Sequence, residues 1–299
     1  MSKKFVSLFL VVLMMFSMTT VSLAEDTSIT VIDMYDREIV LTEAVTRIVA
    51  LSPSDCEILC ALGCEDLLVG RGKYCDYPAS VLELPAVTSG ANTNLEEILA
   101  LEPQVVVMSD MAHTEEQVKL LVENGVQVIG TDADSIAEVY EAIRLLAGVM
   151  DKTAEGEAII ADMQATFDDI AAKSEKTDKT IYFEVMPLEW GLWSAGTGTF
   201  MHELAELCGM QNAFADIEGW QSVSQEQVIE RNPDYIVLVT GMGEAAPDEV
   251  KAREGWGSMD AIVNNAIYNA DSYEMTRPAP RLKNAAINLY NFLNDIEAE

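Results

Sequence analysis

The segment Glu96-Glu97-Ile98-Leu99-Ala100-Leu101-Glu102-Pro103-Gln104-Val105-Val106-Val107-Met108 returns 130 positions later as Glu226-Gln227-Val228-Ile229-Glu230-Arg231-Asn232-Pro233-Asp234-Tyr235-Ile236-Val237-Leu238, without a gap. Each copy predicts a short helix that a proline ends, followed by an apolar run typical of a buried parallel strand. A capping box is expected at the start of each helix, formed by Asn94 with Glu97 and by Ser224 with Gln227. The repeat therefore predicts two lobes built on one plan.

A second, looser repeat supports this plan. Ser52-Pro53-Ser54 leads into a helix that ends at Leu62-Gly63, and Gly198-Thr199 leads into one that ends at Cys208-Gly209. Further strands are expected at residues 47–51, 67–70, 126–131 and 180–185, alternating with helical patterns as βαβ units require. We therefore predict an α/β fold of two Rossmann-like lobes with mostly parallel sheets.

One long helix is predicted between the lobes. Residues 154–173 carry apolar side chains at three- and four-residue steps, namely Ile159, Ile160, Met163, Phe167 and Ile170. Such a helix spans about 30 Å, so it should act as a rigid connector. The expected organisation is a signal peptide at 1–24, an N-terminal lobe at 25–151, the interlobe helix at 152–176 and a C-terminal lobe at 177–299.

The N-terminus has the order of a secretory signal peptide. Lys3 and Lys4 precede an apolar stretch at 5–16, and small residues follow at Ser22 and Ala24. The apolar stretch is too short to span a bilayer comfortably. No cysteine follows the small residues, so no lipid anchor is expected. We therefore expect an exported protein, periplasmic or extracellular.

Charge and composition exclude some partners. The formal charge is −32, or −34 without the predicted signal peptide, and this charge would repel nucleic acid and anionic lipid. With 49% hydrophobic residues the chain has enough apolar surface to fold. A soluble globular protein is therefore expected, with no nucleic-acid partner.

The five cysteines do not suggest a disulfide framework, because their number is odd for an exported chain. Cys56, Cys60 and Cys64 recur every four residues and are expected on one helix face. Buried packing explains them better than metal binding, since no histidine is near in sequence. No cofactor and no bound metal are expected.

Aromatic residues gather where the predicted strands end. In open α/β sheets ligands bind outside the carboxyl ends of the strands. The residues placed there include Tyr74, Tyr77, Trp190, Trp193, Trp220 and the run from Tyr273 to Arg277. Each ring alone could equally hold a loop against its lobe. Together they favour a large, partly apolar ligand.

An enzyme is the main alternative class. Only His113 and His202 are candidate bases near neutral pH, and His202 falls inside a predicted helix. No nucleophile elbow, phosphate loop or dinucleotide-binding fingerprint is present. His113 directly precedes a predicted capping box that starts at Thr114, so an exposed residue before a helix is favoured over contact with the metal centre of a ligand.

Several motifs follow one another along the chain: Arg47-Ile48-Val49-Ala50-Leu51-Ser52-Pro53-Ser54 with Glu57-Ile58-Leu59 after it, Tyr74-Cys75-Asp76-Tyr77-Pro78, the segment 94–103, Trp193-Ser194-Ala195-Gly196, the segment 218–228 and Arg277-Pro278-Ala279-Pro280-Arg281. Together they resemble the solute-binding subunits of ABC importers for vitamin B12, haem and ferric siderophores. The resemblance is greatest to vitamin B12 receptors, and it implies a ligand cleft lined by Tyr74, Trp193, Trp220 and Arg277. It implies capture of a corrinoid, or alternatively of a haem or ferric siderophore, without a chemical change of the ligand. A monomer is expected. An enzyme or a surface-interaction protein remains the alternative of a different class.

The resemblance also implies that Glu96 and Glu226 dock onto arginines of a membrane permease. These glutamates are the matching positions of the repeat, each at the second residue of a capped helix. A favourable interaction with the helix dipole explains them equally well from the sequence alone.

Overall fold

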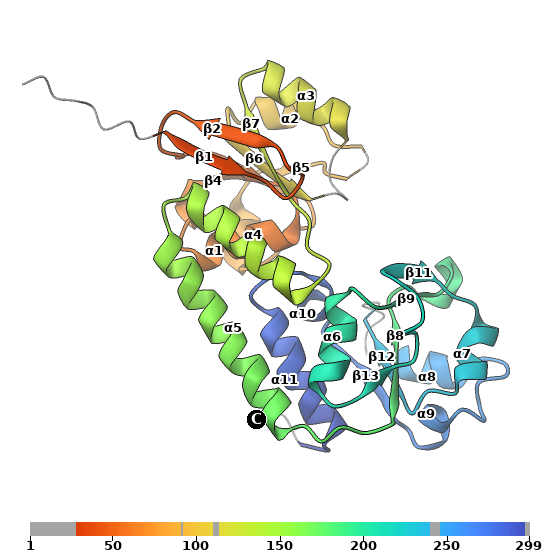
Figure 1. The fold of residues 1–299 in the computed structure, drawn as a ribbon. Coiled ribbons are helices and arrows are strands. Elements are labelled where there is room, and N and C mark those ends of the chain that lie inside the picture. Colours follow the sequence, from red (N-terminus) through yellow and green to blue (C-terminus); the bar gives the residue numbers. More distant parts are fainter. Residues whose placement is uncertain (1–27, 91, 110–113, 240–245, 297–299) are drawn as a thin grey trace, which may run out of the picture.

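A computed structural model describes residues 28–90, 92–109, 114–239 and 246–296, and it contains two α/β lobes joined by one long helix (Figure 1). The predicted signal peptide and His113 lie outside the described residues. The joining helix is α5, Thr153–Lys173, close to the predicted span. Among the helices in the described ranges, none is long and apolar enough to cross a membrane.

The N-terminal lobe is built around a parallel sheet of five strands in the order β5-β4-β3-β6-β7. Its strands are β3 (Ile48–Ala50), β4 (Leu68–Gly72), β5 (Ala86–Val87), β6 (Val105–Ser109) and β7 (Gln127–Thr131). An antiparallel hairpin of β1 (Ile29–Ile32) and β2 (Glu38–Leu41) precedes the sheet. The helices are α1 (Pro53–Ala61), α2 (Leu95–Leu99), α3 (Glu115–Glu123) and α4 (Ile136–Val149).

The C-terminal lobe has a parallel sheet of four strands in the order β10-β8-β12-β13. Its strands are β8 (Thr180–Glu184), β10 (Gln211–Asn212), β12 (Tyr235–Leu238) and β13 (Ile267–Asn269). A separate antiparallel ribbon pairs β9 (Trp193–Ala195) with β11 (Trp220–Ser222). The helices are α6 (Phe200–Leu207), α7 (Gln225–Arg231), α8 (Ala246–Lys251), α9 (Asp260–Val263), α10 (Ser272–Thr276) and α11 (Leu282–Leu293).

The strands of the repeat form because both of their faces are buried. In β6, Val105 and Val107 enter one hydrophobic core, whereas Val106 and Met108 enter another on the opposite face of the sheet. Successive side chains of a strand point to opposite faces, so a strand between two helical layers must be apolar throughout. This requirement explains why the repeat ends in a continuous apolar run.

One hydrophobic core continues from lobe to lobe through α5. Val107 of the N-terminal lobe, Phe167 of α5 and Val237 of the C-terminal lobe belong to the same buried cluster. The helix lies against α4 in one lobe and α11 in the other (Figure 1). The approach to α4 is close, since a Cβ atom on Gly156 would lie 2.6 Å from the Cβ atom of Ala147. The connector is therefore packed at both ends.

The capping box expected at Ser224 and Gln227 is present at the start of α7. The one expected at Asn94 is wrong in part: the Asn94 side chain caps α2, but Glu97 does not accept from the Asn94 backbone. The reason is that the Asn94 amide already donates to the carbonyl of Thr88, at 3.0 Å. The Glu97 carboxylate accepts instead from the Thr88 amide, at 2.8 Å.

Of the three cysteines expected on one helix face, two lie on the helix and the third does not. Cys56 and Cys60 lie on α1, but the helix ends at Ala61, so Cys64 lies beyond it. Gly63 at φ 75° follows the helix end and turns the chain away. All five cysteines are free thiols, and Cys60 alone is not fully buried.

Asp55 in the first turn of α1 is a buried carboxyl that should make stability depend on pH. It hydrogen-bonds to Ser52 and to Thr131, whose Oγ1 lies 2.6 Å from Oδ1, yet burial raises its pKa from 3.8 to about 6. Between these values the folded state holds a proton that the unfolded chain has released. The contribution of Asp55 to stability is therefore present below about pH 4 and is lost as pH rises to about 6.

We expect Asp55→Asn to remove this dependence, because an amide does not titrate. The difference in free energy of unfolding between the variant and the wild type should change by roughly 2–3 kcal/mol between pH 4 and pH 7, in favour of the variant at pH 7. Urea denaturation at a series of pH values measures it. A difference that stays constant over this range would show that the folded protein does not raise the pKa of Asp55.

Candidate functional site

The loop after β4 carries two of the predicted ligand residues and is held by a buried arginine. Arg71 donates to the carbonyls of Val81 at 2.9 Å and Cys75 at 3.0 Å. Gly72 allows the loop to cross the end of β3, because a Cβ atom there would lie 2.1 Å from the carbonyl oxygen of Leu51. This anchoring leaves the two tyrosines of the loop outside the core.

Five of the predicted ligand rings are exposed, although large aromatic side chains normally bury most of their surface. The exposed fractions are 61% for Tyr74, 44% for Tyr77, 69% for Trp190, 38% for Trp193 and 53% for Tyr273. These residues belong to both lobes. Exposed aromatic groups of this kind are typical of a surface that binds a partner or a ligand.

Arg277, which follows α10, reaches across to the N-terminal lobe. Its Nη1 lies 2.9 Å from Oε1 of Glu57 on α1 and 2.7 Å from Oδ1 of Asp76 in the loop after β4. Its Nη2 donates to the carbonyl of Tyr74 at 3.4 Å. Arg281 binds the same Glu57 through Nε at 2.8 Å and Nη2 at 2.6 Å. We name Glu57, Asp76, Arg277 and Arg281 the interlobe charge cluster.

The two arginines of this cluster stack on predicted ligand rings. The guanidinium of Arg277 lies 4.3 Å from the centre of the Tyr273 ring, and that of Arg281 lies 3.8 Å from the centre of the Tyr77 ring. Cation–π contacts of this kind hold the rings in place. The structure thus brings Tyr74, Tyr77, Tyr273 and Arg277 together, from segments about 200 residues apart in sequence.

The predicted tryptophans form a second group in the C-terminal lobe. Trp193 and Trp220 come from the two strands of the β9–β11 ribbon, and Trp190 ends a 3-10 turn three residues earlier. The indole of Trp220 donates to Oδ1 of Asp134 in the N-terminal lobe, at 2.7 Å, and lies edge-on to Phe200. Trp220 therefore contributes to the contact between the lobes, and its role toward a ligand stays a prediction.

Sequence reasoning did not single out Glu57, Asp76, Asp134 and Arg281. Three of them stand in motifs that the sequence does mark, since Glu57 follows Ser52-Pro53-Ser54, Asp76 separates two of the predicted rings and Arg281 ends the Arg277-Pro278-Ala279-Pro280-Arg281 run. Asp134 carries no such signal. Its pairing with Trp220 depends on how the lobes meet.

Glu96 and Glu226 occupy equivalent exposed positions, each the second residue of its helix. Within the described part of the chain neither carboxylate forms an ion pair. Hydrogen bonds from its own backbone amide and from Ser224 lower the pKa of Glu226, so it is charged at neutral pH. Two exposed carboxylates without an ion-pair partner in the described residues, one on each lobe, are available to a basic partner.

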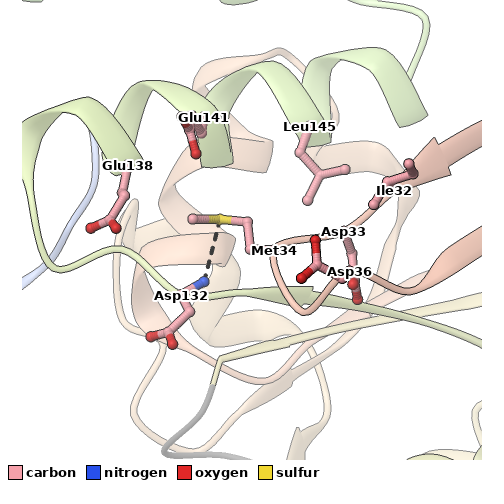
Figure 2. A pocket seen from close by; sticks show the side chains of 8 residues that line it. All are labelled: Ile32, Asp33, Met34, Asp36, Asp132, Glu138, Glu141 and Leu145. Carbon is pink, nitrogen blue, oxygen red and sulfur yellow. Dashed lines mark hydrogen bonds between the residues drawn. The ribbon is translucent and has the colours of Figure 1, made fainter.

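Two hollows in the described structure are lined by other residues than the predicted ligand rings. One, of about 350 Å³, lies between the β1–β2 hairpin and α4, and carboxylates dominate its lining, as Figure 2 shows. There the amide of Asp132 donates to the sulfur of Met34 at 3.3 Å. The other, of about 530 Å³, lies between α4, α5 and α6. None of the predicted ligand residues lines either hollow.

Two groups that an enzyme might use as acid or base have structural contacts. His202 lies 3.4 Å from the amide of Asn212 and 3.6 Å from Glu206. Glu184, at the end of β8, is fully buried and accepts two hydrogen bonds from Arg253, at 2.7 and 2.8 Å. Burial raises the pKa of Glu184, but Arg253 opposes the effect. Among the described residues no group of three metal-binding side chains is close enough to hold a metal ion.

Comparisons with known proteins find relatives over most of the chain. The vitamin B12-binding protein of Salmonella typhi is 31% identical over 258 residues, which cover 85% of this chain and 92% of that protein. The uncharacterized ABC transporter substrate-binding lipoprotein YvrC of Bacillus subtilis (strain 168) is 30% identical over 261 residues, which cover 85% of this chain and 82% of that protein.

A similar solved structure is that of a possible iron-binding (periplasmic solute-binding) protein from Staphylococcus epidermidis ATCC 12228. Its TM-score is 0.72 at 27% identity, and the match covers 84% of this chain and 99% of that one. The sequence pattern of the periplasmic binding protein family matches residues 48–274, from β3 to α10. With two such lobes, a packed connecting helix and relatives that cover most of its length, the chain belongs to the periplasmic binding protein family.

Proposed function

We propose that this protein is the extracytoplasmic solute-binding component of an ABC importer, and that it captures a corrinoid such as vitamin B12. The observation that carries the proposal is the set of exposed rings on both lobes at the carboxyl ends of the strands. A corrinoid is a large, partly apolar macrocycle, so flat aromatic faces suit it. The vitamin B12-binding relatives support the same ligand.

A haem or a ferric siderophore is the second candidate ligand. The possible iron-binding neighbour from Staphylococcus epidermidis supports it at the level of the family. Both kinds of complex are large and partly apolar, so aromatic rings alone do not separate them from a corrinoid. The charges beside the rings distinguish the two kinds of ligand, because a haem carries carboxylates and cobalamin carries amides.

Capture and delivery require no chemical change of the ligand, as befits a family of binding proteins. Export fits the periplasmic and lipoprotein relatives. The YvrC relative is a lipoprotein, so the expected absence of a lipid anchor stays a prediction. We further propose a monomer whose Glu96 and Glu226 meet a membrane permease.

Tryptophan fluorescence tests the ligand. Trp190 and Trp193 are exposed beside the proposed site, so a bound corrinoid should quench a large part of the protein's emission. We expect saturable quenching by cyanocobalamin at one equivalent. Quenching by haem or by a ferric siderophore, with none by cyanocobalamin, would overturn the corrinoid proposal and leave the family assignment intact.

A further inference from the structure

The interlobe charge cluster contains as many carboxylates as guanidinium groups. Glu57 accepts from both arginines, and Asp76 accepts a further hydrogen bond from Arg277. The four groups therefore carry no net charge among themselves. Away from carboxylates, paired guanidinium groups would instead be a strong attraction for the carboxylates of a ligand.

The cluster is part of the ring surface. Each of its arginines lies against one predicted ligand ring, and Arg277 also binds the carbonyl of Tyr74. A ligand on Tyr77 and Tyr273 thus approaches two guanidinium groups. Glu57 and Asp76 already accept hydrogen bonds from the N–H groups of these guanidinium groups. A carboxylate on that ligand would have to displace one of these partners or lie close to it, and like charges in such contact are unfavourable.

Resting on the proposed function, we infer that Glu57 and Asp76 determine ligand specificity: by pairing with Arg277 and Arg281, they favour a macrocycle with uncharged amide side chains over one with carboxylates. Cobalamin carries amides, whereas haem carries two propionates. The large negative charge of the whole chain acts in the same direction. Glu57 and Asp76 do not need to touch the ligand to act in this way.

The two carboxylates differ in how safely they can be changed. The Glu57 side chain is 2% exposed and holds both arginines, so removing its charge threatens the fold. The Asp76 side chain is 35% exposed and holds only Arg277. Asp76→Asn is therefore the variant of choice, because it frees one positive charge and keeps the size of the side chain.

The test compares two ligands that differ by one charge. Isothermal calorimetry would measure binding of cyanocobalamin and of its derivative with one amide hydrolysed to a carboxylate. We expect the wild type to bind the monocarboxylate at least about tenfold more weakly, and Asp76→Asn to reduce this ratio to within about threefold. The control is Glu157→Gln, which makes the same charge change in an exposed pair with Arg144 and should keep the wild-type ratio.

The outcomes separate this inference from the proposed function. Equal affinities in the wild type, or an unchanged ratio in Asp76→Asn, would overturn the inference while the corrinoid proposal stands. If the wild type does not bind cyanocobalamin, the corrinoid proposal fails. The role of Glu57 and Asp76 is then tested with haem and haem dimethyl ester. The wild type should bind the ester more tightly than haem, and Asp76→Asn should reduce this ratio of affinities. Binding of neither pair would overturn both.

Discussion

Replacing Glu96 and Glu226 together by arginine should abolish uptake of the ligand into cells and leave its binding nearly unchanged. Both carboxylates are exposed at the second position of a helix, one on each lobe, and neither lies among the predicted ligand residues. If they meet arginines of the permease, reversal replaces attraction by repulsion at both contacts. Uptake of labelled cyanocobalamin by cells that express the variant with the permease measures the effect.

A matched control separates docking from a simple change of net charge. Glu115 and Glu116 begin α3 behind the Thr114 capping box and are also exposed, so reversing both adds the same charge at another helix start. We expect this control to transport like the wild type. Circular dichroism should show that both variants fold, since at the helix starts only weak interactions with the helix dipole are lost. Normal uptake by the folded Glu96→Arg/Glu226→Arg variant would contradict docking.

The second large effect is expected from the exposed rings. Tyr74→Ala combined with Trp190→Ala should weaken ligand binding by at least about 30-fold, because rings at the centre of a binding surface typically contribute about 2 kcal/mol or more. Stability should hardly change, since both side chains are mostly exposed in the free protein. Calorimetric titration and thermal unfolding measure the two quantities on the same samples.

The control for the rings removes exposed apolar side chains elsewhere. Leu120→Ala with Val263→Ala changes two such residues, one on each lobe, away from the predicted ligand residues. Its affinity should equal that of the wild type. A ring variant that loses stability but keeps its affinity would show that Tyr74 and Trp190 hold their loops in place instead of binding the ligand.

The sequence predicts those elements of the fold in which apolar residues recur in a regular pattern. The matching segments at residues 96–108 and 226–238 become α2 with β6 and α7 with β12, because a buried parallel strand needs an unbroken apolar run. The connecting helix is equally predictable, since its apolar stripe runs from Ile159 to Ile170, about three turns. The β9–β11 ribbon was not predicted. Its strands have only three residues each, too few to show an alternation.

The sequence predicts which residues belong to the candidate site, but it does not predict which of them contact one another. The rule that ligands bind at strand ends selects Tyr74, Tyr77 and Tyr273, which the structure brings together. The partner of Arg277 is Glu57, 220 residues away, and only the way in which the lobes meet creates that pair. The same holds for Trp220 and Asp134. A charge without a nearby partner in sequence gives no sign of which distant charge will meet it.

Equilibrium dialysis against cyanocobalamin, followed by mass spectrometry of the recovered ligand, tests most directly that this protein captures a corrinoid and leaves it unchanged. The purified protein without its predicted signal peptide is used. We predict one cobalamin per chain, with the recovered ligand identical in mass to the one supplied after long incubation. Absence of binding, or recovery of a chemically altered product, would contradict the account.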